Sequence, residues 1–485
     1  MALTVWQHFV EACGLHSDRP AVSSGDQVLT YLDLLNAVND LAETLSGNFV
    51  IDDADGAQPV KIAIYAENSI DYILTYYAAL KLGLLPFLID RAFGKNELES
   101  ISASCGIELF AMSGDQKAFA LSVKSAASVP NYSLSILKIE PVQTAPQPCS
   151  DTVTCRFTSG TTGSPKCLEF SQKAVVNAAQ NWVKGSGLCS EDNILCVATF
   201  ANGLAFNTSL LATFLAGAHL HLFSGPLSSG RIVSVLQKRG ITRLVGFPFL
   251  YKLLTEGKKS ISTVRHAVSA GAQLGEDIKN NFFRQNGFSI SDYFGIAEVG
   301  PCTWNSGMPE SPGLGKALPG VELAVDGSSA HPAEILVKTA SMATRYLNYP
   351  GLLESKINAE GFYQTGDIGY LSDNVLFVTG RLGRGIEISG RKIDPVEIEN
   401  FVRSMPGVQD AHAYAGKDMN EETVIEVSVS STNSIDPSDI RHFCRQALPS
   451  FKVPSLIFVF NELPRSSSGK IRQDELMRMT ASAKP

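Results

Sequence analysis

The sequence predicts an α/β protein with a large N-terminal domain of two helix-covered sheets and a small β-rich subdomain, followed by a small α+β domain. Three observations predict this fold. The 485 residues exceed what one compact core of ordinary size holds. Apolar runs typical of strands alternate with helical periodicities in two separate series. After the second series the chain changes to short strand-like pieces with turn residues, and then to amphipathic helices.

The first series extends from about residue 29 to residue 90. It contains helical patterns at residues 31–45 and 70–83 and strand-like runs at residues 61–66 and 84–89. Such an alternation is typical of βα units. From about residue 112 to residue 152 the composition shifts toward Ser, Ala, Pro and Gln, which predicts a connection between two lobes.

The second series begins after residue 190. It contains strand-like runs at residues 193–200, 218–223, 241–248 and 264–272, with helical patterns at residues 231–240 and 249–257. Because strands and helices alternate again, we expect a parallel sheet covered by helices.

The C-terminal part of the sequence contains two regions with different secondary-structure patterns. From about residue 319 to residue 378, short β-rich pieces and turn residues predict a small mixed or barrel-like subdomain. Beyond Gly380, amphipathic helical patterns at residues 394–405 and 437–448 flank a strand-like run at residues 423–431. A segment of this size and pattern predicts a small α+β domain.

Composition narrows the possible partners and the location. The chain is 44% hydrophobic and 18% charged, and its formal net charge of −8 gives no reason to expect nucleic acid as a partner. The nine cysteines are odd in number and include no CxxC pair, which predicts free thiols in a reducing compartment. The N-terminus lacks a signal-peptide pattern, and no uncharged apolar stretch reaches the ~18 residues that a membrane span needs. We therefore expect a cytoplasmic protein without a membrane span.

The most informative segment is TSGTTGSPK at residues 158–166. It follows a strand-like run, and ligands of open α/β sheets usually bind at strand ends. Glycines let backbone N–H groups approach phosphate oxygens, hydroxyls add donors and a lysine adds positive charge. The candidate phosphate-binding residues are Thr158, Ser159, Gly160, Thr161, Thr162, Gly163 and Lys166.

Two other interpretations of this segment are an ordinary Ser/Thr/Gly surface loop and a Walker-type loop. The Walker pattern fails on spacing, because it requires Lys and then Ser or Thr directly after the second glycine. Here Gly163 is followed by Ser, Pro, Lys and Cys.

The segment resembles the phosphate-loop signature of the adenylate-forming superfamily, which includes acyl-CoA synthetases, adenylation domains of nonribosomal peptide synthetases and luciferases. Further stretches resemble other motifs of this family, in the family's order and along nearly the whole chain. They are LTYLDL (29–34), SAGAQ (269–273), YFGIAE (293–298), YQTGD (363–367), GR (380–381) and LPRSSSGK (463–470).

The resemblance implies a site for ATP and Mg²⁺. The residues implied to lie near the adenine are Gly271, Ala272, Phe294 and Gly295. Glu298 would help to hold Mg²⁺ on the phosphates, a role that suits a hard carboxylate oxygen. Asp367 would accept hydrogen bonds from the ribose hydroxyls, and Arg381 would be a second nucleotide contact. Ala297 stands where the family usually has threonine, so this chain offers no hydroxyl there.

The resemblance also implies a catalytic lysine and a domain movement. Lys470 would reach both the substrate carboxylate and the α-phosphate. We expect an adenylation domain at residues 1–380 and a mobile C-terminal domain at residues 381–485. Gly383 replaces the usual Asp or Lys of the hinge, and glycine permits the dihedral changes that a hinge requires. Glu387 replaces a common lysine near the face used in the second step, so its charge bears on which thiol donor docks.

Together the motifs predict an acid–thiol ligase. ATP would activate a carboxylic acid as an acyl-AMP with release of pyrophosphate, and the acyl group would pass to the thiol of coenzyme A or of carrier-protein phosphopantetheine. The first step needs no nucleophilic side chain, and the eight histidines show no catalytic or metal-ligand spacing. Three alternatives stay open: an enzyme dedicated to loading an acyl or peptidyl carrier protein, a nonenzymatic nucleotide-binding relative, and a luciferase-like oxygenase.

The family alignment places the acid pocket at residues that are mostly apolar or small: Phe200, Ala201, Asn202, Gly246, Ala270, Tyr293, Pro301 and Cys302. Amino-acid-activating relatives usually have an Asp at the place of Ala201, where it pairs with the α-ammonium group, and many acyl-CoA synthetases have a His there. An ammonium group left unpaired in a buried pocket is strongly disfavoured. We therefore expect an aryl or apolar aliphatic acid rather than a standard α-amino acid.

Overall fold

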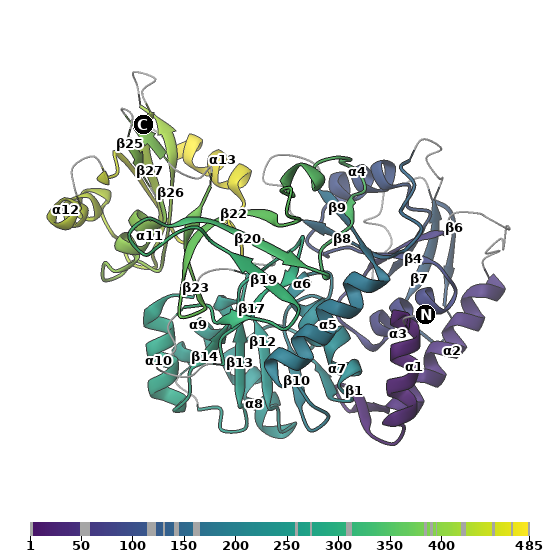
Figure 1. The fold of residues 1–485 in the computed structure, drawn as a ribbon. Helices are drawn as coiled ribbons and strands as arrows, with labels where there is room; N and C mark the ends of the chain where they lie inside the picture. Colours follow the sequence, from purple (N-terminus) through teal and green to yellow (C-terminus); the bar gives the residue numbers. More distant parts are fainter. Residues whose placement is uncertain are drawn as a thin grey trace.

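A computed structural model describes residues 3–48, 59–113, 123–129, 131–139, 145–158, 165–257, 260–271, 274–306, 313–382, 386–388, 391–393, 395–418, 423–448, 452–466 and 469–483. Figure 1 shows a large body that contains the two large sheets and their helices, and a smaller body formed by the C-terminal segment at its upper left. This architecture confirms the predicted α/β fold with a large N-terminal and a small C-terminal domain.

The seven-stranded sheet contains the strands of the second predicted series. Its strands are β1 (Pro20–Ser24), β2 (Gln27–Thr30), β10 (Asn193–Cys196), β11 (His219–Leu222), β12 (Arg243–Gly246), β13 (His266–Ser269) and β14 (Ile290–Asp292). Their order is β14-β13-β12-β10-β11-β1-β2, and all neighbours are parallel except β1 and β2. The helices α8 (Ser229–Lys238), α9 (Pro248–Glu256) and α10 (Glu276–Asn286) share a hydrophobic cluster with this sheet. The parallel, helix-covered sheet expected from the second series is therefore present.

The eight-stranded sheet is mixed. Its strands are β3 (Lys61–Tyr65), β4 (Leu85–Leu88), β5 (Leu109–Met112), β6 (Val123–Ser128), β7 (Ser135–Ile139), β8 (Thr152–Thr158), β9 (Lys166–Ser171) and β21 (Arg345–Tyr346). Their order is β21-β9-β8-β4-β3-β5-β7-β6. The central strands β8, β4, β3 and β5 are parallel, whereas the strands at both edges are antiparallel to their neighbours. The helix α4 (Lys95–Cys105) packs on one face of this sheet.

The segment from residue 112 to residue 152 is more than a connection. β6 and β7 form an antiparallel hairpin, and β7 pairs with β5, so the segment extends the eight-stranded sheet by two strands. The expectation of a plain connection between lobes is wrong for this part. VKSAAS in β6 has little apolar character, and its pairing at the sheet edge, rather than a local pattern, makes it a strand.

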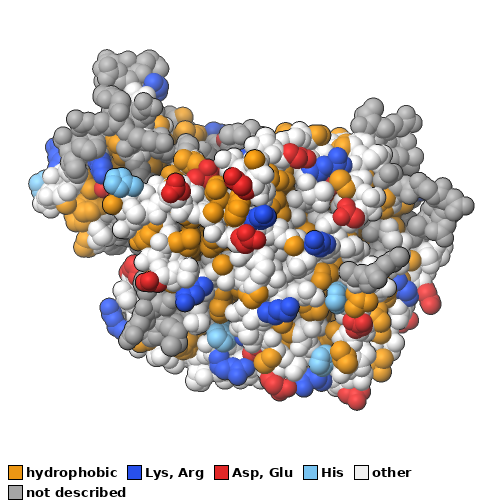
Figure 2. Space-filling model, viewed as in Figure 1, with side chains coloured by type: hydrophobic (Ala, Val, Ile, Leu, Met, Phe, Trp, Pro, Cys, Tyr) orange, Lys and Arg blue, Asp and Glu red, His pale blue; other side chains and the backbone are white. Residues whose placement is uncertain are grey.

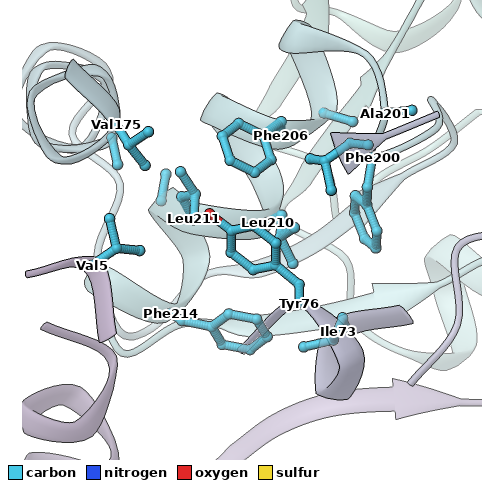
Figure 3. Packing of buried hydrophobic residues seen from close by; sticks show 14 of the residues in the cluster. Val5, Ile73, Tyr76, Val175, Phe200, Ala201, Phe206, Leu210, Leu211 and Phe214 are labelled. Carbon is cyan, nitrogen blue, oxygen red and sulfur yellow. The ribbon is translucent and has the colours of Figure 1, made fainter. Parts of the chain in front are cut away.

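The largest hydrophobic core includes residues of both sheets and of several helices. These helices include α1 (Val5–Leu15), α2 (Tyr31–Asn48), α3 (Ile70–Lys81), α5 (Gln172–Ser186) and a continuous helix made of α6 (Gly203–Ala205), the π-helical segment η2 (Phe206–Leu211) and α7 (Ala212–Leu215). Ser69 caps α3 by accepting the Tyr72 N–H at 3.1 Å. The Tyr76 ring of α3 lies edge-on to the Phe206 ring, with centroids 5.6 Å apart. Figure 3 shows Tyr76 among Ile73, Leu210 and Phe214, close to the ring of Phe206.

The β-rich subdomain is a six-stranded sheet with antiparallel pairing. Its strands are β17 (Thr303–Trp304), β18 (Lys316–Ala317), β19 (Val321–Ala324), β20 (Ala333–Thr339), β22 (Tyr363–Ser372) and β23 (Val375–Arg381). Their order is β17-β18-β23-β22-β20-β19. The sheet therefore begins before the predicted start at residue 319.

The C-terminal domain is a small α+β unit with its own hydrophobic core. Its elements are β24 (Ile386–Ile388), β25 (Arg391–Ile393), α11 (Pro395–Arg403), β26 (Asp410–Lys417), β27 (Thr423–Ser430), α12 (Pro437–Ala447), β28 (Leu456–Phe460) and α13 (Gln473–Ala483). β26 pairs antiparallel with β27, which pairs parallel with β28. The predicted boundary between residues 380 and 381 stays a prediction.

Three further properties of the structure bear on the expectations from composition. Within the described ranges, no helix has both the length and the apolar character needed to cross a membrane. On the face that Figure 2 shows, Lys and Arg side chains are interspersed with Asp and Glu. All nine cysteines are free, and most of them are buried.

Candidate active site

The phosphate-loop motif joins two antiparallel strands. Thr158 ends β8, Lys166 begins β9, and the two residues are register partners. The Nζ atom of Lys166 lies 6.0 Å from the centroid of the Tyr349 ring. A Walker-type loop leads from a strand into a helix, so this strand-to-strand connection agrees with the spacing argument against that motif. The predicted loop residues Ser159, Gly160, Thr161, Thr162 and Gly163 lie outside the described residues.

Three predicted acid-pocket residues lie at the carboxyl ends of neighbouring parallel strands. Gly246 is the last residue of β12, Ala270 follows β13, and Tyr293 follows β14. Register pairs join these strand ends, because Ser269 pairs with both Gly246 and Asp292. Ligands of open α/β sheets bind at such an edge.

The motifs assigned to adenine border the same edge. Gly271 has a φ of +87°, in the left-handed region that favours glycine. Phe294 is 7% exposed, and its N–H donates to the Thr303 hydroxyl at 2.9 Å. A Cβ on Gly295 would lie 2.8 Å from the carbonyl oxygen of Gly300, so the backbone packs too closely there for a side chain.

The other acid-pocket residues approach this edge from two connecting segments. Phe200 and Ala201 are buried, and Asn202 caps α6 with its side chain. Pro301 lies in β16 (Gly300–Pro301), which pairs with β15 (Gly295–Ile296), and Cys302 follows it. α6 packs against both β12 and β16, so it joins the two segments. The structure therefore brings the eight predicted pocket residues to one region.

Glu298 lies in the turn between β15 and β16 and is held by the neighbouring chain. The Tyr346 hydroxyl donates to Glu298 Oε1 at 2.5 Å, and the Ala343 N–H donates to the Glu298 carbonyl oxygen at 2.7 Å. Desolvation, followed by the nearby Glu298 carboxylate, raises the pKa of Tyr346. The phenol therefore stays protonated and orients the carboxylate.

Asp367 and Arg381 face each other across β22 and β23. They are register partners, and Arg381 Nε lies 3.6 Å from Asp367 Oδ1. Asp367 is 8% exposed, so it is not the exposed turn residue that a TGD triplet alone would suggest. Desolvation raises the pKa of Asp367, whereas the nearby charges of Arg381 and Lys470 act in the opposite direction.

Lys470 reaches this group from the C-terminal domain. Its backbone N–H donates to the Ser466 hydroxyl at 3.2 Å. Desolvation and the neighbouring Arg381 lower the pKa of Lys470, while Glu298 and Asp367 act in the opposite direction. The Lys470 residue as a whole is exposed to solvent. The structure thus brings Lys470 together with Glu298, Asp367 and Arg381.

Three other predicted positions lie wholly or partly outside the described residues. Ala272 and Gly383 lie outside the described residues. The backbone of Glu387 lies in β24, but its side chain is outside the description.

Three side chains near these residues belong to none of the predicted site positions. Tyr346 belongs to no motif, and nothing in the local sequence indicates its hydrogen bond to Glu298. Tyr72 lies in a helical pattern rich in apolar residues, so nothing in the sequence distinguishes it from a core residue. Arg156 had a visible signal, because it is a charged residue within an otherwise buried stretch of β8, two positions before Thr158.

The arrangement fits Mg²⁺ held on substrate phosphates rather than in an all-protein cage. The described part of the chain holds no group of three His, Cys, Asp or Glu side chains that could bind a metal. Glu298 supplies one oriented carboxylate, and Mg²⁺ commonly binds one or two carboxylates together with phosphate oxygens. Positive charge from Lys166, Arg381 and Lys470 suits the remaining negative charge of a nucleotide.

Comparisons with known proteins agree with this site. The AMP-binding enzyme family matches residues 9–347, and the AMP-binding enzyme C-terminal domain matches residues 397–470. 4-Coumarate–CoA ligase 3 from Arabidopsis thaliana is 27% identical over 355 residues, which cover 67% of this chain and 63% of that protein. Bacitracin synthase 3 from Bacillus licheniformis is 25% identical over 96% of this chain but only 8% of its own length.

A solved structure shows the same fold over the full length. The o-succinylbenzoate CoA synthetase from Bacillus subtilis, in complex with its acyl-adenylate intermediate, superposes with a TM-score of 0.83 at 21% identity. The likeness covers 98% of each chain. The family match over most of the sequence confirms the predicted adenylate-forming superfamily. This chain belongs to the AMP-binding enzyme family.

Proposed function

We propose that this protein activates a carboxylic acid with ATP as an acyl-AMP and then transfers the acyl group to a thiol. One observation carries the proposal. Lys470 of the C-terminal domain lies with Glu298, Asp367 and Arg381 of the N-terminal part, near the strand ends that hold the predicted acid pocket. A cation at this junction is placed to act on a carboxylate and a nucleotide together.

In the first step a carboxylate oxygen attacks the α-phosphorus of ATP, and the bond from that phosphorus to pyrophosphate breaks. Two anions must approach each other, so the reaction depends on positive charge and strict positioning. Lys470 would bridge the carboxylate and the α-phosphate, and Lys166 would offset charge on the departing pyrophosphate. Mg²⁺ bound by Glu298 and the phosphates would add Lewis-acid stabilisation.

The nucleotide would be positioned by side chains at the same junction. The Asp367 carboxylate would accept hydrogen bonds from the ribose hydroxyls, and Arg381, which faces it across the strand pair, would make a second contact. Gly271, Ala272, Phe294 and Gly295 would border the adenine. The close backbone packing at Gly295 and the positive φ of Gly271 support a role that needs small residues.

The second step requires another arrangement of the domains. In this proposal the segment from residue 381 to residue 485 rotates about Gly383, which withdraws Lys470 and admits the thiol. The thiolate attacks the acyl carbon, and AMP leaves. Both acceptors, coenzyme A and carrier-protein phosphopantetheine, carry this thiol.

The acid is proposed to be aryl or apolar aliphatic rather than a standard α-amino acid. Ala201 is 6% exposed and offers no carboxylate to an α-ammonium group. Arg156 contacts the same region, because a Cβ on Gly203 would lie 2.6 Å from Arg156 Nη1. A nearby guanidinium disfavours a second cation in the pocket.

Coenzyme A and a carrier protein remain the two acceptor candidates. The Arabidopsis thaliana relative is named as a CoA ligase, whereas bacitracin synthase 3 is a much longer protein of which this chain spans 8%. The reversed charge at Glu387 favours an enzyme dedicated to a carrier protein. A cytoplasmic location stays a prediction from the free cysteines.

The test is ATP–pyrophosphate exchange across a panel of aryl, aliphatic and α-amino acids, followed by acyl transfer to coenzyme A or to a holo-carrier protein. Exchange with aryl or aliphatic acids is the expected result. Strong exchange with an α-amino acid alone would overturn the acid assignment. Absence of exchange with every acid would favour a nonenzymatic nucleotide-binding relative, and oxygen consumption with light emission would favour a luciferase-like oxygenase.

A further inference from the structure

Arg156 is a buried cation of β8 that lies close to Gly203, the residue after the predicted pocket residues 200–202. It is 4% exposed. Its Cζ atom lies 4.2 Å from the centroid of the Phe170 ring and 5.0 Å from that of Phe206. Phe206 begins the π-helical segment η2, and such segments are frequent at functional sites.

The guanidinium of Arg156 lacks an acceptor. It makes no hydrogen bond and no ion pair to any residue that the structure describes, and its Nε atom is buried without a partner. The Tyr72 hydroxyl is also buried without a partner in the described structure. Burial raises the pKa of Tyr72, with further effects of nearby charges that include Arg156, so its hydroxyl is a donor. Two hydrogen-bond donors in one region, the Arg156 guanidinium and the Tyr72 hydroxyl, therefore have no acceptor in the described structure.

The other buried cations among the described residues, Lys61 and Arg243, have hydrogen-bond acceptors. The ammonium of Lys61, in the same sheet, donates to the carbonyl oxygens of Cys105 at 2.9 Å and Pro146 at 3.0 Å. The guanidinium of Arg243 donates to Asp192 Oδ2 at 2.8 Å. Buried charges are normally paired in this way, because an unpaired charge away from water is strongly unfavourable. The buried charge of Arg156 is therefore unpaired in the described structure, whereas the buried charges of Lys61 and Arg243 have acceptors.

The open donors lie next to residues of the predicted acid pocket. Arg156 Nη1 approaches Gly203, which directly follows the pocket segment 200–202. The Tyr72 ring lies 5.5 Å from the Phe200 ring, centroid to centroid. Figure 3 shows Phe200 and Ala201 beside Phe206, the ring that Arg156 contacts.

We propose that Arg156, with the Tyr72 hydroxyl, binds a second carboxylate of the acid substrate, so the protein activates one end of a dicarboxylic acid. The inference rests on the proposed function and changes the class of its acid from a purely aryl or apolar one to one that carries a second carboxylate. An anion is the ligand that a buried guanidinium lacks, and a carboxylate accepts its hydrogen bonds in pairs. The aromatic rings beside the cation fit an aryl or short apolar segment between the two carboxylates.

The second carboxylate, rather than the reacting one, belongs at Arg156. The reacting carboxylate must lie near Lys470, whose surroundings are Arg381, Glu298 and Asp367. Arg156 contacts Phe170, Phe206 and Gly203 instead, and Glu298 is the charge that acts on both Arg156 and Lys470. One acid can therefore present one carboxylate to each cation.

The test compares matched pairs of acids in ATP–pyrophosphate exchange. Each pair consists of a dicarboxylic acid and the monocarboxylic acid with the same skeleton, and a third member carries a hydroxyl in place of the second carboxylate. The wild-type protein should prefer the best dicarboxylic acid by at least ~10²-fold in kcat/KM, as sites built around a polar substrate group do. Equal or better use of the monocarboxylic or hydroxyl member would overturn the proposal.

Variants connect the preference to the residue. Arg156→Met should lose the preference mainly through the KM of the acid, and Arg156→Lys should regain part of it. Lys61→Met is the matched control, because it removes a buried cation from the same sheet but should keep the preference. Thermal stabilisation by added ATP checks that each variant is folded and binds nucleotide.

The outcomes separate this inference from the proposed function. A preference that persists in a folded Arg156→Met variant overturns the inference alone. Exchange with monocarboxylic acids only also overturns it but supports acid activation. Absence of exchange with every acid overturns the proposed function and this inference together.

Discussion

The charged side chains at the two ends of the seven-stranded sheet differ in how completely they are paired. At the amino ends of β10, β12 and β13, the carboxylate of Asp192 accepts hydrogen bonds from Arg243 at 2.8 Å, Arg265 at 2.8 Å and the Thr242 hydroxyl at 2.7 Å. Although desolvation raises the pKa of Asp192, these partners outweigh it and the pKa is lowered. We call these four residues the amino-end cluster.

At the opposite end, charged side chains lie close together, but their charges are not fully paired, so they can still bind a ligand. Lys470 keeps contact with solvent, Arg381 lies 3.6 Å from Asp367, and Arg156 has no acceptor in the described structure. Groups that satisfy each other stabilise the fold, whereas groups held in place without full pairing are ready to bind something else. The comparison predicts that mutations at the amino end act on stability and those at the carboxyl end act on the reaction.

The largest effect is expected for Arg243→Met in the amino-end cluster. It leaves the buried Asp192 carboxylate without its most buried partner, and breaking such a pair costs about 3–5 kcal/mol. Urea unfolding measures the loss. Arg265→Met is the control, because the Arg265 side chain is 59% exposed and an exposed pair contributes roughly 1 kcal/mol or less. Equal losses in the two variants would contradict the assignment of the buried pair.

Lys470→Ala at the carboxyl end should slow adenylation by at least ~10²-fold, equivalent to ~3 kcal/mol of barrier. The stability of the fold should change little. Thiolysis of supplied acyl-AMP should survive, since the second step does not use this lysine. Lys452→Ala is the control. It removes an ammonium group of the same domain, one that pairs with Glu397, and it should leave adenylation unchanged. Equal loss of both half-reactions in Lys470→Ala would count against the catalytic assignment.

A smaller effect is expected for Tyr346→Phe, which removes the hydrogen bond to Glu298. A hydrogen bond to a charged group contributes about 1.5–3 kcal/mol, so kcat/KM should fall by at least roughly 10-fold. Because Glu298 is the proposed Mg²⁺ ligand, the Mg²⁺ concentration for half-maximal exchange should rise as well. Tyr370→Phe, in β22, is the control for loss of a phenol hydroxyl. An unchanged Mg²⁺ dependence would separate Tyr346 from the metal.

The smallest effect concerns pH and returns to the amino end. Desolvation and the Arg243 guanidinium lower the pKa of His266 to about 4, although Asp192 opposes them. An unfolded histidine has a pKa of about 6.5, so the unfolded state takes up a proton first as the pH falls. The contribution of His266 to stability is therefore complete above that value and is lost as the pH falls toward 4.

Urea midpoints at pH 7.5 and pH 5 test this prediction. The decrease in stability between the two conditions should be smaller in His266→Gln than in the wild-type protein. The exposed His331, in a loop of the β-rich subdomain, offers the matched control His331→Gln. A decrease of the same size in all three proteins would show that His266 does not contribute to the pH dependence.

Local patterns in the sequence predicted many of the elements. The helix α3, the strands β3 and β12 and the helix α12 lie where periodicity and strand-like runs placed them. The family resemblance predicted the overall architecture and the superfamily, and the family match confirms the latter. The roles of individual residues such as Lys470 and Asp367 stay predictions, although the structure brings them together.

Strands at or next to a sheet edge were harder to predict, because some pair with distant parts of the chain and others have a weak apolar pattern. β1 pairs with β11, so Val22 lies beside Leu220. β6 has a weak apolar pattern and becomes a strand only by pairing with β7. A strand of this kind is stabilised by its neighbours rather than by its own composition, so local analysis misses it.

The sequence by itself determined the family, the order of the motifs and the chemistry that their side chains can perform, because these depend on residue types at fixed spacing. The tertiary structure decided which charges are satisfied. Arg156 and Arg243 look alike in the sequence, since each lies in an apolar strand. Only the folded chain places a carboxylate beside Arg243 and aromatic rings beside Arg156, because pairing of a buried charge depends on contacts between distant segments.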